Sequence, residues 1–440
     1  MSRRAAIAGA AGTTVEYYDY SVFAYLAVTL VPIFLPTHGF GSGILTILAI
    51  YGAGFAARPL GGIVFGVLGD RLGRRKIMLV TVSMTGVATL AVGLLPTYQA
   101  IGPAAPILLT ALRLIQGFAA GGEAPGSATY VAESAPDAKR GFHGSATNIG
   151  ISLGLGLAAT SVGVVIGLCS AEQMASWGWR IPFLLALPLL LATLYYRLKI
   201  EDSPLFQEML AGRRRAKAPI AVVLTHHRAA FLKVFGVTFG WSIASLGVGA
   251  YTVVHYGTLG YKLSATIWIG VLMALVLIPF TLLSGALSDR FGRRRLLFAG
   301  FIGSLVLSLP CFLLMQQGSF ALALVAGVVF NIPAGVVMGA SFAAYTEQFP
   351  TEVRLTGVSL GFNLASVLGT SQVNFVAGWL VATTGSTLGP AYYAMAGAVV
   401  ALIATATIRE GARESLRPAT AANESRQPDA EDGLGDPVAG

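Results

Sequence analysis

Long apolar runs separated by short polar stretches follow one another from end to end of the chain. Residues 77–96 and 264–284 show the pattern, because each run, folded as a helix, is long enough to cross a hydrocarbon core of about 30 Å. Twelve spans are predicted, at residues 14–36, 43–68, 77–96, 105–132, 141–168, 178–199, 230–257, 264–287, 296–315, 320–346, 355–383 and 388–408. The pattern therefore predicts an all-α polytopic membrane protein.

Composition and charge support this prediction and add an orientation. The chain is 55% hydrophobic and only 11% charged, whereas soluble domains are roughly 25% charged. Of the 29 Lys and Arg residues, Arg58 and Arg113 fall inside spans, and Arg180 and Lys262 fall on one side. The other 25 (29 − 4) fall in alternate loops, at the termini or in the span ends next to them. This asymmetry predicts a multi-pass protein of the cytoplasmic (inner) membrane with both termini cytoplasmic, and it explains the net charge of +9 without a nucleic-acid partner.

Two internal repeats divide the chain into halves. GVLGDRLGRRK (66–76) returns as GALSDRFGRRR (285–295), and ESAPDAKR (133–140) is echoed by EQFPTEVR (347–354). Halves of equal topology imply a pseudo-twofold axis along the membrane normal, as in carriers that alternate access around a midplane site. The predicted units are a six-helix bundle at 1–199, a cytoplasmic linker at 200–228, a second six-helix bundle at 229–408 and a disordered cytoplasmic tail at 409–440.

The repeated loop resembles the signature loop of the major facilitator superfamily. Its matching residues are Gly66, Asp70, Arg71, Gly73, Arg74 and Arg75. EYYDY (16–20), RLIQGFAAGGE (113–123) and WGWRIPF (177–183) narrow the resemblance to the metabolite:proton symporter family, although Ala124 departs from its pattern. The resemblance implies the major facilitator fold and transport, with protons, of organic acids such as citrate and shikimate or of zwitterions such as proline and betaine.

Acidic residues in the spans are candidates for proton coupling. Glu16 and Asp19 are three residues apart, so they share one helical face, which must turn away from lipid. A carboxylate in a partly dehydrated cavity takes up a proton and releases it when a cation approaches. We predict that Asp19 carries the proton and that Glu16 and Glu123 assist it. The alternative is that these acids only pair with Arg58 or Arg113 and hold helices together.

Two arginines within the spans are candidates for substrate binding. Arg58 lies about 18 Å along the helix from Asp70, near mid-membrane, and an arginine can hold a carboxylate through two parallel hydrogen bonds. The predicted substrate is therefore a small organic acid, with a zwitterionic osmolyte and a non-transporting metabolite receptor as alternatives. The predicted substrate-binding residues are Arg58, Arg113, Gln116, Tyr18, Asn148, Tyr251 and Asn363.

The repeated loop predicts a gate. A carboxylate at the end of the second span can cap the positive N-terminus of a helix in the other half. We expect such contacts to close the cytoplasmic side and to break when it opens; simple topology-setting charge would explain the arginines but not the aspartates or glycines. The predicted gating residues are Gly66, Asp70, Arg71, Gly73, Arg74 and Arg75, with Asp289, Arg290 and Arg293 in the second copy.

Other chemical patterns are weak. GISLG (150–154) and GVSLG (357–361) match a hydrolase nucleophile pattern, but both lie in glycine-rich spans and are typical of close helix packing. Cys169 and Cys311 are too few for a disulfide framework or a metal site. We therefore expect no enzyme activity, no metal and no cofactor. The expected partners are a small organic anion, the proton and the lipid bilayer, and the expected state is a monomer.

Overall fold

A computed structural model describes residues 2–36, 40–211, 216, 218–245, 255–256, 259–260 and 263–417. Within these ranges every regular element is helical. The first part contains α1 (Ser2–Phe34), α2 (Phe40–Leu72), α3 (Arg74–Leu94), α4 (Tyr98–Ile101), α5 (Ala104–Ser134), η1 (Asp137–Lys139), α6 (Arg140–Leu168), α7 (Ala171–Gln173), η2 (Met174–Gly178), α8 (Arg180–Leu184) and α9 (Ala186–Leu198). It is followed by α10 (Pro204–Ala211), α11 (Pro219–His226), α12 (Arg228–Ala244), α14 (Leu263–Phe291), α15 (Arg293–Met315), α16 (Phe320–Thr346), α17 (Arg354–Thr384) and α18 (Gly389–Thr407).

The helices confirm the predicted polytopic fold. In the described part of the chain, eleven helices are long and apolar enough to cross a membrane, and the pair α11 and α12, bent by 88°, brings the number up to twelve. The sixth span, predicted over 178–199, corresponds to a longer helical stretch, Ala171–Leu198, which is divided into α7, η2, α8 and α9. The seventh span, predicted over 230–257, coincides with α12 as far as Ala244. Residues 246–254 lie outside the described ranges.

The first helix begins well before the predicted boundary at residue 14. Residues 2–13 are rich in Ala and Gly, and Ala5 and Ala8 pack with Met78, Tyr130 and Ile200. These residues are too small to register as an apolar run, yet Ala favours helix and lets neighbouring helices approach closely. Packing therefore extends α1 beyond the stretch that hydropathy alone marks as a span.

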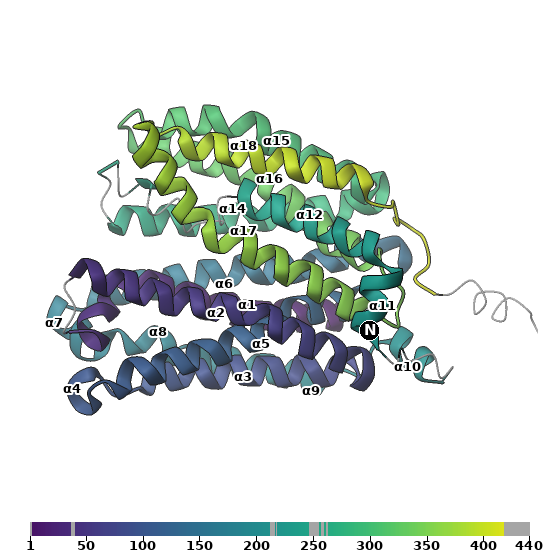
Figure 1. Cartoon of the computed structure of the whole chain (residues 1–440), viewed down its shortest axis with the longest axis horizontal. Helices are drawn as coiled ribbons and strands as arrows, with labels where there is room; N and C mark the ends of the chain where they lie inside the picture. Colours follow the sequence, from purple (N-terminus) through teal and green to yellow (C-terminus); the bar gives the residue numbers. More distant parts are fainter. Residues whose placement is uncertain are drawn as a thin grey trace, which may run out of the picture.

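The helices form two bundles that lie side by side (Figure 1). The helices α1 to α9 make one bundle, and the helices α12 to α18 make the other. The bundles meet where α6 packs on α14 and α16 and where α2 and α5 pack on α17. Both ends of the described chain lie at the same end of the molecule, next to α10 and α11 (Figure 1). The exact division of the chain at residues 199 and 229 stays a prediction.

The stretch between the bundles and the tail are partly described. The predicted linker at 200–228 contains two short helices, α10 and α11. Residues 409–417 of the predicted tail contain no regular helix, and residues 418–440 lie outside the described ranges.

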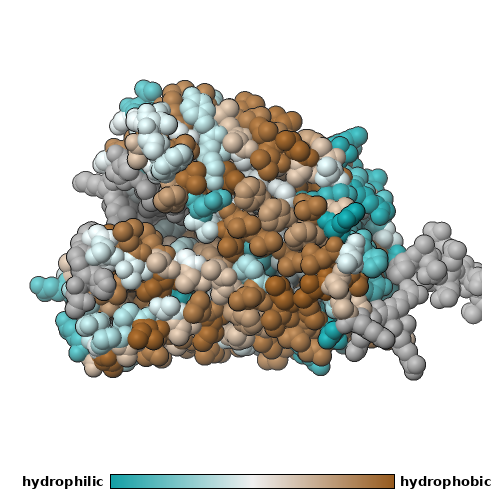
Figure 2. Space-filling model, in the orientation of Figure 1, coloured by the Kyte–Doolittle hydropathy of each residue, from teal (hydrophilic) through white to brown (hydrophobic). Residues whose placement is uncertain are grey.

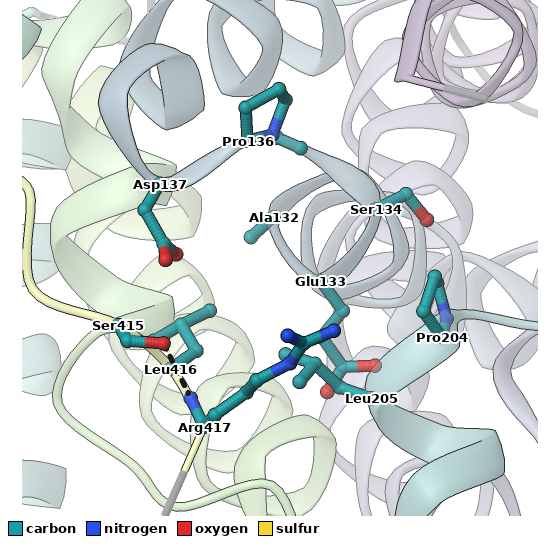
Figure 3. Close-up of a pocket in the computed structure, with 11 residues that line it drawn as sticks. Ala132, Glu133, Ser134, Pro136, Asp137, Pro204, Leu205, Ser415, Leu416 and Arg417 are labelled. Atoms are coloured by element: carbon teal, nitrogen blue, oxygen red, sulfur yellow. Dashed lines mark hydrogen bonds between the residues drawn. The ribbon is translucent and has the colours of Figure 1, made fainter. Parts of the chain in front are cut away.

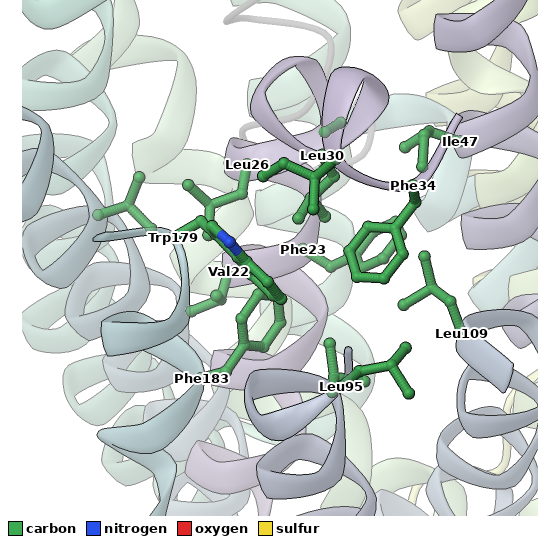
Figure 4. Packing of buried hydrophobic residues seen from close by; sticks show 14 of the residues in the cluster. Val22, Phe23, Leu26, Leu30, Phe34, Ile47, Leu95, Leu109, Trp179 and Phe183 are labelled. Atoms are coloured by element: carbon green, nitrogen blue, oxygen red, sulfur yellow. The ribbon is translucent and has the colours of Figure 1, made fainter. Parts of the chain in front are cut away.

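The surface and the interior agree with a membrane setting. Figure 2 shows hydrophobic side chains over the middle of the molecule and hydrophilic ones at its ends. Exposed apolar side chains such as Leu45, Val87 and Phe375 face outward, as lipid-facing residues do. Inside the first bundle, Phe34 meets the Trp179 ring edge-on at 5.5 Å within the apolar cluster of Figure 4.

Glycines set the distance between α2 and α5. A Cβ atom placed on Gly117 would lie 1.7 Å from the carbonyl oxygen of Gly54. A Cβ on Gly61 of α2 would lie 1.7 Å from the carbonyl oxygen of Phe118. The two backbones therefore touch through their glycines, which is a common way for membrane helices to pack. This contact places α2, which carries Arg58, directly against α5, which carries Arg113.

We expect Gly117→Ala to destabilise the protein, because the added methyl group forces α2 and α5 apart. Overpacking of this kind costs roughly 1–3 kcal/mol. Gly126→Ala on the same helix is the matched control, since a Cβ there would meet only Met78 Cγ, at 3.8 Å. The melting temperature of each variant in detergent is measured by heating samples and monitoring the remaining folded protein by size-exclusion chromatography. Equal melting temperatures for the two would contradict the close contact.

Candidate functional site

Asp19 is the centre of a buried polar cluster in the first bundle. Its side chain is 0% exposed and accepts hydrogen bonds from Arg113 Nη1 at 3.0 Å, Gln116 Nε2 at 2.6 Å and Thr89 Oγ1 at 2.8 Å. Arg113 Nη2 reaches the second carboxylate oxygen at 3.4 Å, and the guanidinium lies over the Phe23 ring at 4.0 Å. The helices α1, α3 and α5 thus meet at one carboxylate whose charge is balanced by one arginine.

Glu16, one helical turn away, forms a second pair. Arg58 Nη2 lies 2.8 Å from Glu16 Oε1, and both side chains are buried. Arg58 Nε donates to the Tyr20 hydroxyl at 3.3 Å. The guanidinium carbon lies over the rings of Tyr20 at 4.3 Å, Phe55 at 4.7 Å and Tyr17 at 5.7 Å. Arg58 is therefore held by one carboxylate and surrounded by aromatic faces.

Glu123 belongs to a third pair that sequence reasoning did not predict. Arg197 on α9 donates to both Glu123 carboxylate oxygens and to Ser127 Oγ, the latter at 3.0 Å. Thr81 Oγ1 donates to the same carboxylate at 2.6 Å. Arg197 lies inside the predicted span 178–199, and this position is the signal in the sequence that points to a buried partner. The three pairs together carry no net formal charge.

The predicted substrate-binding residues do not form one group. Arg58, Arg113 and Gln116 gather around the acids of α1, whereas the Tyr18 hydroxyl donates to the Pro182 carbonyl at 2.6 Å inside the first bundle. Tyr251 lies outside the described residues.

The two predicted asparagines instead join the bundles. Asn148 Nδ2 on α6 donates to the Met338 carbonyl at 2.5 Å, and Asn363 Nδ2 on α17 donates to the Gly121 carbonyl at 2.7 Å. Each bond connects a helix of one half to the backbone of the other. In this conformation the two side chains therefore hold the halves together.

Asp70 caps a helix of the opposite half. Its carboxylate accepts from the backbone N–H groups of Leu355 at 3.2 Å and Thr356 at 2.9 Å and from Thr356 Oγ1 at 2.7 Å. These groups belong to the first turn of α17, where backbone donors have no intrahelical partner and the helix dipole is positive. Gly66 permits the approach, since a Cβ there would lie 3.0 Å from Thr356 Cα.

A chain of alternating charges surrounds this cap. Arg74 lies 3.1 Å from Asp70 and 3.2 Å from Glu133, and Arg354 of the other half lies 2.8 Å from Glu133. All four side chains are buried. The network therefore ties α2, α3 and α5 to α17 through charge-assisted hydrogen bonds, which are among the stronger polar contacts in proteins.

The second copy of the loop repeats the arrangement. Asp289 accepts from the backbone N–H groups of Gly141 and Phe142, each at 2.8 Å, at the start of α6. Arg293 lies 2.8 Å from Asp289 and 3.2 Å from Glu347, and Arg140 lies 2.9 Å from Glu347. Both networks lie at the end of the molecule that carries the termini (Figure 1). In this conformation that end is closed.

The other predicted gating residues have smaller parts. Gly73 adopts φ 113° at the turn between α2 and α3, where glycine is favoured. Arg75 donates to the Leu198 carbonyl at 2.9 Å, while Arg71 and Arg290 are exposed.

Two further acids, which the sequence analysis did not predict, each cap the N-terminus of a helix. Asp202 accepts from Arg74 N and Glu410 accepts from Arg293 N, both at 2.9 Å. Asp202 lies in EDSPLF (201–206), directly after the first bundle.

A pocket of about 350 Å³ lies beside the first network (Figure 3). Glu133, Asp137, Leu205 and Arg417 are among its lining residues. Glu133 is 17 residues after Gln116 on α5, about 26 Å along the helix axis. The pocket is therefore separate from the Asp19 cluster.

The family model described as Major Facilitator Superfamily matches residues 20–371, and a second match covers residues 258–431. The chain belongs to the Major Facilitator Superfamily. The predicted family and fold are thereby confirmed, and the chain is a multi-pass membrane protein.

Curated relatives of this superfamily member are named as transporters. The glycine betaine/proline/ectoine/pipecolic acid transporter OusA of Dickeya dadantii (strain 3937) is 33% identical over 430 residues, covering 96% of this chain and 86% of its own. The proline/betaine transporter of Escherichia coli (strain K12) is 34% identical over 439 residues, with the same coverage of 96% and 86%. The shikimate transporter of Escherichia coli (strain K12) is 34% identical over 419 residues, covering 94% and 95%.

A solved structure supports the fold. The proton:xylose symporter XylE bound to 6-bromo-6-deoxy-D-glucose has a TM-score of 0.79 and 18% identity, covering 94% of this chain and 97% of its own. At this identity the likeness concerns the fold alone. The named relatives include both substrate kinds that the resemblance to the metabolite:proton symporter family implied, zwitterions and an organic acid.

We expect Asp70→Asn to open the end that carries the termini, because it removes the charged acceptor at α17. A hydrogen bond to a charged group contributes about 1.5–3 kcal/mol, so the ratio of open to closed molecules rises roughly tenfold or more. Spin labels on Leu72→Cys and Phe291→Cys, in a chain lacking Cys169 and Cys311, report the change. Pulsed electron paramagnetic resonance should show more of the longer distances.

Asp202→Asn is the matched control for this experiment. Its carboxylate also caps a helix N-terminus, but that helix, α3, lies in the same bundle as α2. We expect the label distances to stay as in the unmutated chain. Equal distributions in both variants would show that Asp70 does not hold the halves together.

Proposed function

We propose that the chain is a proton-coupled symporter that imports a small zwitterion of the proline or betaine kind. The observation that carries this proposal is the pairing of Asp19 with Arg113 and of Glu16 with Arg58. A site whose charges already balance suits a solute that carries one positive and one negative group and no net charge. Two of the curated relatives described above are named for such solutes.

The proposal prefers the zwitterionic alternative to the organic acid that the sequence analysis predicted. That prediction relied on Arg58 and Arg113 as positive charges available to an anion. Both guanidinium groups are bound to carboxylates, and their side chains are buried. An anion entering this site would place an extra charge in a medium of low dielectric, which costs several kcal/mol unless a cation pairs with it.

An organic acid is the second candidate, since a shikimate transporter is equally similar to the chain. A proton taken up by Asp19 removes the charge that holds Arg113, and the guanidinium is then able to bind a substrate carboxylate. The same step serves a zwitterion, whose carboxylate also needs a partner. The two candidates differ in the charge moved in each cycle.

The Asp19 cluster gives a direct route to coupling. Loss of the Asp19 charge leaves Arg113 as a buried cation without a counterion, a state that costs about 3–5 kcal/mol. A substrate carboxylate relieves that cost, so proton and substrate bind together. When the proton leaves, Asp19 competes for Arg113 again and the substrate is released. Gln116 and Thr89 keep the carboxylate in position during both steps, because both donate to it.

The gating networks give the direction of access. We place the termini and both capped helices on the cytoplasmic side, as the charge asymmetry of the loops predicts. The conformation described here is then closed toward the cytoplasm. Opening toward the cytoplasm separates Asp70 from α17 and Asp289 from α6, and the two halves rock about the site between them.

We expect uptake of betaine or proline into proteoliposomes to move positive charge inward. A zwitterion with one proton carries a charge of +1, so an inside-negative potential imposed with potassium and valinomycin should stimulate uptake severalfold. Uptake of a monocarboxylate with one proton would be electrically neutral and insensitive to the potential. Shikimate and proline, each tested as labelled substrates, distinguish the candidates. Accumulation of shikimate but of neither zwitterion would overturn the proposal.

We expect Asp19→Asn to abolish accumulation driven by a pH gradient, because the amide cannot release a proton. Exchange of internal for external substrate should continue, since it requires no net proton movement. Arg113 already lacks a charged partner in this variant, so substrate binding should be retained. Uptake under a gradient and exchange without one are measured in the same vesicles. Gradient-driven accumulation at the unmutated level would exclude Asp19 as the proton carrier.

A further inference from the structure

Arg58 occupies an aromatic box that is formed by two neighbouring helices. The box consists of the rings of Tyr17, Tyr20 and Phe55, and its charged wall is Glu16. All three rings lie within the distance of about 6 Å at which a cation is attracted to an aromatic face. The guanidinium thus acts as a resident cation in a site built for a positive group.

The walls of the box are held in place from outside. Tyr20 and Phe55 meet at 4.8 Å between ring centroids, and Tyr51 packs against both, at 6.1 Å from Tyr20 and 5.2 Å from Phe55. Tyr51 itself stacks on Phe23, at 6.0 Å. These contacts hold the Tyr20 and Phe55 rings without using Arg58, so two walls of the box have support besides their present occupant.

The box lies at the contact between the two bundles. Tyr17 packs against an apolar cluster that combines Ile151 of the first bundle with Val234 and Phe362 of the second. One turn beyond Arg58 on α2, a Cβ on Gly62 would lie 2.5 Å from Asn363 Nδ2. A solute that enters between the halves from the end opposite the termini therefore reaches the box before it reaches the Asn363 contact and the Asp70 cap.

We propose that this box binds the cationic group of the transported zwitterion, and that Arg58 occupies it while no substrate is present. The inference rests on the proposed function and adds to it the place of the ammonium group. On binding, the substrate cation takes the place of the Arg58 guanidinium between the rings and Glu16. Arg58 turns toward the substrate carboxylate, which Arg113 also contacts once a proton has neutralised Asp19. Every charged group of the site and of the solute then faces one of opposite sign.

This exchange gives the two acids of α1 different tasks. Glu16 and Arg58 receive the substrate and consume no proton, while Asp19 and Arg113 respond to the proton. Glu16 Oε2 is buried and accepts no hydrogen bond from the described residues. A secondary ammonium such as that of proline has N–H groups for this oxygen. A quaternary ammonium such as that of betaine has none and depends on the ring faces.

The box therefore predicts a separation of the two solutes by one substitution. We expect Phe55→Leu to weaken betaine binding by about tenfold and proline binding by less than about threefold, since the cation–ring attraction is largest for a desolvated quaternary group. Phe55→Trp should restore betaine binding, which shows that the leucine variant is not merely misfolded. Isothermal titration calorimetry of the full chain in detergent measures both solutes directly.

Phe118→Leu is the matched control on the neighbouring helix α5. Its ring packs on Phe65, with the centroids 5.0 Å apart, and belongs to no wall of the box. We expect betaine and proline to bind this variant as they bind the unmutated chain. Equal betaine affinities for Phe55→Leu and Phe118→Leu would overturn the proposal that the box binds the substrate cation. The proposed function would still stand in that case if the unmutated chain took up betaine into vesicles. Binding of neither zwitterion, together with uptake of shikimate alone, would overturn both.

Discussion

A buried charge in a membrane protein must have a partner, and this requirement organises the structure. Removing an ion from water costs several kcal/mol, and a counterion at hydrogen-bond distance offsets much of that cost. Asp19, Glu16 and Glu123 each meet one arginine from another helix. The positions of α1, α2, α5 and α9 relative to one another are therefore restricted by charge as well as by the apolar packing around Phe34 and Trp179.

The same requirement explains how a firmly packed protein can have two states. At the end that carries the termini, Asp70 and Asp289 each cap a helix of the opposite half. The caps lose their acceptors when the halves separate, so a half-open arrangement leaves backbone donors and carboxylates unpaired. Such contacts are either made or broken, and packed interfaces of this kind switch between discrete arrangements. The repeat in the sequence makes the two caps equivalent, which suits a rocking motion of similar halves.

The paired charges at the centre of the first bundle bear on which solute the protein can accept. In such a site every charged side chain is already paired. A solute is accepted most readily when each of its charged groups meets a side chain of opposite charge whose own ion pair has opened. In the mechanism we propose, the Asp19 pair is released by a proton, and the Glu16 pair is released by exchange with the solute itself. Transport and coupling then depend on the same ion pairs that hold the first bundle together, and a variant that removes one partner affects stability and activity at once.

The sequence by itself determined the features that depend on local or periodic patterns. Apolar length predicted the spans, because a helix rises by a constant amount per residue. The repeat of Gly66 and Asp70 at Gly285 and Asp289 predicted two similar halves and a carboxylate at the end of corresponding helices. The spacing of Glu16 and Asp19 placed both acids on one face. The start of α1 was predicted too late, since alanine and glycine carry little hydropathy signal.

Only the tertiary structure decided the partners. Asp19 and Arg113 are 94 residues apart, and Glu123 and Arg197 are 74 residues apart. Which arginine meets which acid depends on the rotation and depth of each helix, and these are set by glycine contacts such as that of Gly117 with Gly54. The partners of Asn148 and Asn363 in this conformation could not be predicted for the same reason. A polar side chain in a span must find a partner, but the span alone does not say whether that partner is a solute or the backbone of the opposite half.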